Sequence, residues 1–392
     1  MAETVAVREI DPYARYGIPE LGLRNYWYPV LLSREVRSKP RPVKLLNEDL
    51  VVFRDAGKVF ALSDRCAHRG ARLSQGKCEF PGTGTITCPY HAWTYDGATG
   101  KCVAALLEGP GQSSSCEASV RVYPTREHAK IIWVFVGDMD AVELQEDIPE
   151  ILANTKDWFS ISVHYDYRCN WRALVDNFSF EFHAPYVHRN SPELFFQPIL
   201  RFGQDVLTEE AQGKKGLYYR GVGGVNKAEY PGLGRFPRDW WRVMKPTGRG
   251  KPFDPVSSGA ARKYGFKSIK QVLLPGSSLV GRDSGEYWLL QAAVPLDANT
   301  TRLFNINIWK RGSLVREAVD RVIYHAWRRW AHDVIFSGQD KRILDRLVPG
   351  PEWLSKTDVG LMRWRRFTSV NARRATGAAE APKATVASSS AE

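Results

Sequence analysis

Two short segments of the chain each combine one cysteine with one histidine, side chains that commonly hold transition metals. The first pair is Cys66 and His68, and the second is Cys88 and His91. Two thiolates and two imidazoles suit a [2Fe–2S] cluster in which two Cys hold one iron and two His hold the other. This ligand set raises the reduction potential of the cluster above that of an all-thiolate cluster.

A Cys₂His₂ zinc site would use the same four side chains. Zinc fingers, however, usually space their ligands as Cys-x₂₋₄-Cys and His-x₃₋₅-His. Each segment here mixes one Cys with one His instead. The spacing therefore favours the iron–sulfur cluster over zinc.

The residues around both pairs resemble those of a known iron–sulfur domain. The first run reads Cys66-Ala-His68-Arg-Gly, and the second reads Cys88-Pro-Tyr-His91-Ala-Trp-Thr-Tyr-Asp-Gly. Both are similar to the Rieske domain of the Rieske-type non-haem iron oxygenases. The resemblance implies that these four Cys and His residues bind a Rieske [2Fe–2S] cluster.

A second pair of histidines, His183 and His188, lies near the end of a helix predicted from Trp171 to Val187. Two imidazoles plus one carboxylate, with open positions left over, are the ligand set of non-haem Fe(II) that activates O₂. In the family that the chain resembles, an Asn-Trp-Arg stretch, a Glu/Asp-Asn pair and two His carry the mononuclear iron. The resemblance therefore implies His183 and His188 as iron ligands and adds Asn177 to the catalytic residues.

The third iron ligand should be a carboxylate on a late helix. Asp333 and Asp340 both follow the amphipathic helix that apolar spacing predicts from Leu314 to Trp330. They are seven residues apart and would share one face of a continuous helix. The run that begins at Gln339 and Asp340 resembles the ligand helix of the family, which favours Asp340 and leaves Asp333 as the alternative.

One position departs from the family pattern. Three residues before the first iron-ligand histidine the family usually has an acid that relays electrons between subunits, and here that residue is Phe180. Asp176 shares the helix face of His183, whereas Glu181 faces elsewhere on a regular helix. A break in the helix would turn Glu181 inward, and on that basis Glu181 is narrowly favoured for the relay over Asp176.

The predicted fold class is α+β, with an N-terminal antiparallel β domain followed by a catalytic domain. Short β-rich runs punctuated by Gly, Asp and Pro predict the first domain, and the resemblance implies a helix-grip-like second domain with a large antiparallel sheet. The predicted segments are a lead-in at 1–24, the Rieske domain at 25–140, the catalytic domain at 150–370 and a disordered tail at 371–392.

Composition excludes some classes of protein and leaves others open. The apolar stretches are strand-length, far short of a membrane span, and the N-terminus lacks the apolar core of a signal peptide, so a cytoplasmic protein is expected. The net charge is +12, from 55 basic and 43 acidic residues. Without a nucleic-acid motif, this charge indicates either an acidic electron-transfer partner or an ordinary solvated surface.

These features together predict the terminal oxygenase of a multicomponent Rieske system, which hydroxylates a small aromatic or heteroaromatic substrate with O₂. The chain has neither a ferredoxin cysteine motif nor a dinucleotide fingerprint, so an external NAD(P)H-dependent reductase, a ferredoxin or both must supply two electrons. The resemblance also implies a head-to-tail homotrimer. The alternatives are an oxidative O- or N-demethylase and a Rieske electron-transfer protein without oxygenase activity.

Overall fold

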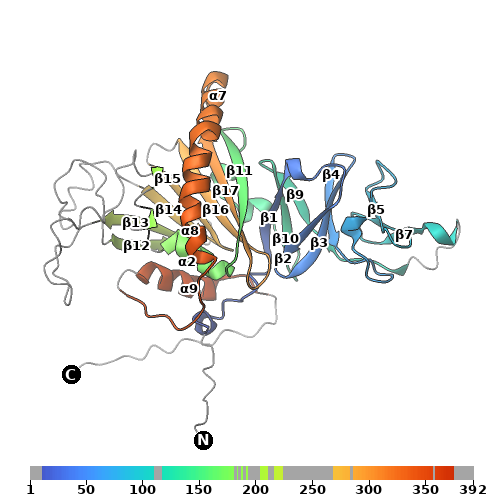
Figure 1. The fold of residues 1–392 in the computed structure, drawn as a ribbon, viewed down its shortest axis with the longest axis horizontal. Coiled ribbons are helices and arrows are strands. Elements are labelled where there is room, and N and C mark those ends of the chain that lie inside the picture. Colours follow the sequence, from blue (N-terminus) through green and yellow to red (C-terminus); the bar gives the residue numbers. More distant parts are fainter. Residues whose placement is uncertain are drawn as a thin grey trace, which may run out of the picture.

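A computed structural model describes residues 11–109, 117–180, 183, 187–188, 191–192, 204–210, 216–223, 268–282, 286–355 and 358–374. These residues form two antiparallel β units arranged along the long axis of the molecule, with the helices gathered on the second unit (Figure 1). The predicted α+β fold class is confirmed. None of the helices among these residues is long and apolar enough to cross a membrane.

The N-terminal unit contains three small antiparallel sheets, ordered β1-β10-β9, β2-β3-β4-β8 and β5-β6-β7. Two strands, β1 and β10, are buried along their whole length, which explains their nearly continuous apolar sequences. The strands of this unit are β1 (Tyr26–Leu32), β2 (Arg41–Leu45), β3 (Glu48–Asp55), β4 (Lys58–Ser63), β5 (Thr85–Thr87), β6 (Trp93–Asp96), β7 (Cys102–Ala105), β8 (Val122–Tyr123), β9 (Thr125–His128) and β10 (Ile131–Val136).

The second unit is built on one seven-stranded antiparallel sheet, ordered β11-β17-β16-β15-β14-β13-β12. Its first and last strands in the sequence, β11 and β17, pair along ten residues each, from Trp158 opposite Lys310 to Tyr167 opposite Thr301. The strands are β11 (Trp158–Tyr167), β12 (Gln204–Glu210), β13 (Gly216–Gly223), β14 (Ser268–Leu273), β15 (Ser277–Arg282), β16 (Tyr287–Pro295) and β17 (Thr301–Lys310).

Helices cover one part of this sheet. The longer helical segments are α2 (Trp171–Phe180), α7 (Leu314–Ile323), the π-helical segment η7 (Tyr324–Phe336), α8 (Ser337–Leu344) and α9 (Val359–Asn371). The short ones are α1 (Glu150–Ala153) and the 3₁₀ turns η1 (Ala14–Tyr16), η2 (Ser33–Glu35), η3 (Leu73–Gln75), η4 (Leu106–Glu108) and η6 (Leu144–Glu146). Side chains cap the N-termini of two long helices. The Asn170 side chain accepts from the Arg172 amide at the start of α2, and the Ser313 side chain accepts from the Arg316 amide at the start of α7.

The segments α7, η7 and α8 follow one another directly, so one helical run extends from Leu314 to Leu344. The amphipathic helix predicted from Leu314 to Trp330 lies within this run. Its apolar stripe is exposed to solvent rather than packed on the sheet. The buried residues of the run lie on its other side and include Tyr324 and Asp333 of η7, whose side chains hydrogen-bond to each other.

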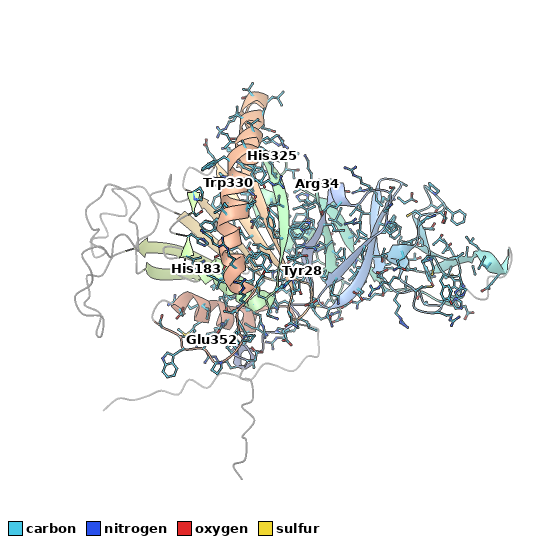
Figure 2. The ribbon with its side chains drawn as sticks, in the orientation of Figure 1. Tyr28, Arg34, His183, His325, Trp330 and Glu352 are labelled. Atoms are coloured by element: carbon cyan, nitrogen blue, oxygen red, sulfur yellow. The ribbon has the colours of Figure 1, made fainter. Side chains whose placement is uncertain are left out.

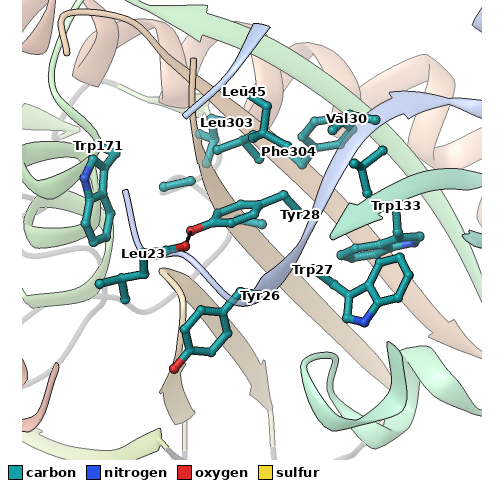
Figure 3. Close-up of a cluster of buried hydrophobic side chains, with 14 of the residues drawn as sticks. Leu23, Tyr26, Trp27, Tyr28, Val30, Leu45, Trp133, Trp171, Leu303 and Phe304 are labelled. Atoms are coloured by element: carbon teal, nitrogen blue, oxygen red, sulfur yellow. Dashed lines mark hydrogen bonds between the residues drawn. The ribbon is translucent and has the colours of Figure 1, made fainter. Parts of the chain in front are cut away.

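One hydrophobic core joins the two units. Strand β1 supplies Trp27 and Tyr28, which are buried together with Trp133 of β10 and with Phe304 of strand β17 (Figure 3). The Tyr28 hydroxyl donates to the Leu23 carbonyl at 2.6 Å, so this buried polar group has a hydrogen-bond partner. The two units are therefore packed as one body.

A buried ion pair fastens helix α2 to both ends of the described chain. The Arg365 guanidinium of α9 is fully buried and donates to Asp176 of α2 at 2.6 Å and to both carboxylate oxygens of Glu352. The Tyr13 hydroxyl donates to the same Asp176 carboxylate at 2.5 Å. Burial, and then the Asp176 carboxylate, raise the pKa of Tyr13, so Tyr13 stays protonated as a donor.

Replacing Arg365 with leucine should lower the free energy of unfolding by about 3–5 kcal/mol, because the Asp176 carboxylate would remain buried without its cation. Urea unfolding followed by circular dichroism measures the loss. Arg366→Ala, which removes the next, exposed arginine of the same helix, should be neutral. Asp176→Asn in the Arg365→Leu background should recover part of the loss, and no recovery would show that the destabilisation is steric.

Candidate iron–sulfur and mononuclear iron sites

The first ligand group sits on two tight loops of the N-terminal unit. Cys66 follows strand β4, and its amide donates to the Ala71 carbonyl while the Gly70 amide donates back to the Cys66 carbonyl. Cys88 follows β5, and its amide donates to the carbonyl of Trp93, which begins β6. Each Cys and His pair is thus held by a short backbone turn.

Within these loops the two thiols lie inside and the two imidazoles lie toward the surface. Cys66 and Cys88 are buried, whereas His68 is exposed and His91 partly so. The His68 and His91 rings are 4.6 Å apart, and the Trp93 ring stacks on His68 at 4.6 Å. Two thiols on one side and two imidazoles on the other fit a cluster whose two irons have different ligands.

The ionisation of these groups also suits metal binding. Partial desolvation, and then the nearby His68 and Arg69 side chains, lower the pKa of His91, which favours the neutral imidazole that a metal requires. Burial, and to a lesser extent the neighbouring Cys66, raise the pKa of Cys88. Burial disfavours the thiolate form of a cysteine, and a bound metal cation offsets this cost and stabilises the two thiolates.

Tyr95 of strand β6 is an additional residue of this site. Its hydroxyl lies 3.1 Å from the Cys66 sulfur and accepts a hydrogen bond from the Ala67 amide at 3.1 Å. Tyr95 is fully buried, and its neighbour Thr94, which points to the other face of β6, is buried as well. Its partner, 29 residues away, could not be predicted from local pattern.

The second ligand group brings together His183, His188 and Asp340. The Nε2 atoms of both histidines lie 3.1 Å from the same Asp340 oxygen, Oδ1, and the three potential ligand atoms lie within 4.8 Å of one another. The histidines follow helix α2, and Asp340 lies in the first turn of α8. Figure 2 shows His183 beside the lower part of the long helical run, below Trp330.

Two buried atoms in this group face each other without a hydrogen bond. Among the described residues, neither His188 Nε2 nor Asp340 Oδ1 has a hydrogen-bond partner. Burial raises the pKa of Asp340, but the imidazoles of His183 and His188 outweigh burial and lower it below the ordinary value. An ionised carboxylate beside two imidazoles, with lone pairs left over, is a donor set that fits Fe(II).

The other candidate residues lie in different surroundings. Asp333 is held by the Asn305 amide at 3.1 Å and the Tyr324 hydroxyl at 2.7 Å, and the three-residue metal group does not include it. Asn177 is buried, with its amide nitrogen 3.5 Å from His183 Nε2. Asp176 lies in the ion pair with Arg365. Glu181 lies outside the described residues, so its proposed relay role stays a prediction.

Comparisons with known proteins agree with this arrangement. Residues 26–124 match the Rieske [2Fe-2S] domain, and residues 157–353 match the ring hydroxylating alpha subunit, catalytic domain. The terminal oxygenase component of carbazole 1,9a-dioxygenase from Metapseudomonas resinovorans is 35% identical over 186 residues, 47% of each chain. The chain therefore spans about half the length of the curated relatives that it matches.

Solved structures match over more of the chain. The terminal oxygenase of carbazole 1,9a-dioxygenase from Novosphingobium sp. KA1 superposes with a TM-score of 0.74 and 26% identity, covering 92% of this chain and 96% of that one. A carbazole-bound variant of such an oxygenase, solved in complex with ferredoxin, has a TM-score of 0.72 and 25% identity over 92% of both chains.

The fold and the two ligand groups define a two-domain protein with a Rieske domain and a helix-covered antiparallel sheet. The chain belongs to the ring-hydroxylating alpha-subunit family and carries the Rieske [2Fe–2S] domain of that family at its N-terminal end. The resemblance to Rieske-type non-haem iron oxygenases, predicted from the two Cys and His runs, is confirmed.

Tyr95→Phe should lower the reduction potential of the cluster by about 40 mV. The hydroxyl next to the Cys66 sulfur stabilises the more negative, reduced cluster, a hydrogen bond is worth about 1 kcal/mol net, and 59 mV corresponds to a tenfold change for one electron. Redox titration of the visible spectrum measures the shift. Tyr90→Phe is the matched control, since the Tyr90 ring stacks on His91 instead, and an equal shift in both variants would contradict the assignment to the Cys66 hydrogen bond.

Proposed function

We propose that this chain is the terminal oxygenase of a multicomponent system, which uses O₂ and two external electrons to hydroxylate a small aromatic or heteroaromatic substrate. The observation that carries the proposal is the convergence of His183, His188 and Asp340 in a chain that also has the Rieske ligand set. Fe(II) held by two imidazoles and one carboxylate keeps open positions for O₂ next to a substrate.

The residues of the chain support this chemistry in separate ways. The pKa of Asp340 lies below its ordinary value, so its carboxylate is ionised at neutral pH and can balance the charge of a metal. His188 is fully buried, which keeps bulk water from its side of the site. Asn177 lies against His183 and supplies a polar group at the end of α2.

Electron delivery requires partners, because a one-electron cluster supplies only half of what O₂ activation needs. Strands β5 to β7, which flank the Cys88 and His91 loop, lie at one end of the long axis, well apart from α2 and α8, which lie over the sheet of the second unit (Figure 1). This separation supports a head-to-tail trimer, in which the Rieske domain of one chain serves the iron site of the next.

An acidic ferredoxin or reductase is the proposed donor. The net charge of the chain is +12, and exposed arginines surround the cluster ligands, among them Arg65 and Arg69. The Arg69 guanidinium lies 5.7 Å from the centre of the Tyr90 ring, which in turn stacks on His91. The ferredoxin complex of a related oxygenase lends support to a donor of this kind.

The proposal is tested with purified protein, NADH, a generic reductase with ferredoxin, and a panel of aromatic substrates under ¹⁸O₂. We expect about three irons and two sulfides per chain, counted from one [2Fe–2S] cluster and one Fe(II), and labelled oxygen in the product. Aryl methyl ethers in the panel separate hydroxylation from demethylation, because demethylation releases formaldehyde. Absence of O₂-dependent product from fully iron-loaded protein across the panel would overturn the oxygenase proposal.

His183→Ala should lose the mononuclear iron and at least a hundredfold in product formation, yet keep the visible spectrum of the cluster. The reason is that His183 belongs to the group at Asp340 and not to the Cys66 loop. Iron analysis and absorption spectroscopy measure the two outcomes separately. If the variant keeps full turnover, His183 does not hold the iron at which the substrate is oxygenated.

Turnover with the natural donor should fall steeply between about 50 and 300 mM salt, since exposed charges are screened beyond a Debye length of about 8 Å at physiological ionic strength. Turnover driven by a small chemical reductant should change little over the same range. Steady-state rates with each donor provide the comparison. The same salt dependence for both would mean that the basic surface does not guide the donor.

A further inference from the structure

Two residues of the long helical run contact the His188 ring, one at its edge and one on its face. The Gln339 side-chain oxygen, Oε1, lies 2.8 Å from His188 Nδ1. The Phe336 ring stacks on the imidazole at 3.6 Å between ring centres, with 16° between the planes. His188 is fully buried in this arrangement.

The hydrogen bond at the edge fixes which nitrogen of His188 carries the proton. A side-chain amide oxygen can only accept, so Nδ1 must be the donor. In a neutral imidazole the proton on Nδ1 leaves a lone pair on Nε2. That Nε2 atom is the one that lies 3.1 Å from Asp340 Oδ1 without a hydrogen-bond partner among the described residues.

Two acceptor atoms therefore face each other across the site, an imidazole lone pair and a carboxylate oxygen. Neither can satisfy the other, and buried polar atoms that lack a partner are costly. A cation between them would satisfy both at once. The proton placement imposed by Gln339 thus makes this side of the site receptive to a metal.

The same helical segment supplies all three contacts on His188. Phe336 is the last residue of η7, and Gln339 and Asp340 lie in the first turn of α8. Residues three and four positions apart on a helix lie on one face. The face that brings the carboxylate to His188 therefore also brings the stacking ring and the hydrogen-bond acceptor.

We propose that Gln339 is a positioning residue of the mononuclear site, which holds the Nδ1 proton of His188 and thereby directs the Nε2 lone pair to the metal. This inference rests on the proposed function, since it takes the group at Asp340 to bind Fe(II). It adds a role for a residue that is not itself one of the three potential metal ligands. Gln339 acts through His188.

The test measures Fe(II) affinity rather than turnover. Protein with an intact cluster is stripped of mononuclear iron, and Fe(II) binding is measured anaerobically by competition with a chelator. Gln339→Leu should weaken Fe(II) binding about 10–100-fold, the usual cost of losing the partner of a metal-bound histidine. Gln339→Glu keeps an acceptor oxygen on a side chain of the same length, and should bind at least as tightly as the wild type.

Two controls separate a positioning role from a general disturbance. Arg342→Ala changes an exposed residue of the same helix and should leave the affinity unchanged. The visible spectrum of the cluster and the melting temperature report whether each variant is folded. Rescue by Gln339→Glu is the decisive comparison, because a residue that merely fills space would not distinguish an acceptor from an apolar side chain.

Wild-type affinity in Gln339→Leu, or an equal loss in Gln339→Leu and Gln339→Glu, would overturn the positioning role while leaving the oxygenase proposal intact. Failure of the wild-type protein itself to bind Fe(II) at this site would overturn the proposed function instead. The two failures are therefore distinguished within one experiment.

Discussion

The meeting of Asp340 with the two histidines depends on the length of strand β17 and on the length of the helical run that follows it. Strand β17 leads the chain away from α2, and the helical run brings it back. Strand β11 ends at Tyr167, opposite the start of β17, and helix α2 begins there. β17 then runs away from this end for ten residues, about 33 Å at about 3.3 Å per residue. The helical run from Leu314 to Asp340 rises about 1.5 Å per residue in its α-helical parts and less in the π-helical η7, so it spans a length comparable to β17 and returns to α2.

This return path explains why Asp340, rather than Asp333, joins the histidines. Asp333 is hydrogen-bonded to Asn305, in the middle of β17, and precedes Asp340 by seven residues, about two helical turns, so it does not reach the start of β17, where α2 begins. Further along the helical run, Ser337 accepts from the Tyr167 hydroxyl and Asp345 from the Arg168 amide, which marks the level where α2 begins. The π-helical segment η7 lies within this span and helps to set the rotation at which Asp340 arrives.

Features formed by residues close together in the sequence could be predicted from it, whereas contacts between distant residues could not. The Cys66 and Cys88 loops are local turns, and their ligand types and spacing define the cluster site without any long-range contact. The family resemblance favoured Asp340 over Asp333 as the third ligand, and the structure brings Asp340 to the two histidines through the lengths of β17 and of the helical run after it. The partner of Asp176 is Arg365, 189 residues away, and no local pattern connects the two. Apolar spacing gave a helix at Leu314 to Trp330, but not which of its faces meets the sheet.

The shared aromatic core around Tyr28, Trp27 and Trp133 has a mechanical consequence. Domains joined by small polar interfaces swing as hinges, whereas a large apolar interface resists such movement. Here the strand that starts the Rieske domain is itself part of the packing against the catalytic sheet. The two units of the chain are accordingly fixed relative to each other. In the proposed head-to-tail assembly, the distance between the cluster of one chain and the iron site of the next would therefore be set by the arrangement of rigid chains and not by movement within a chain.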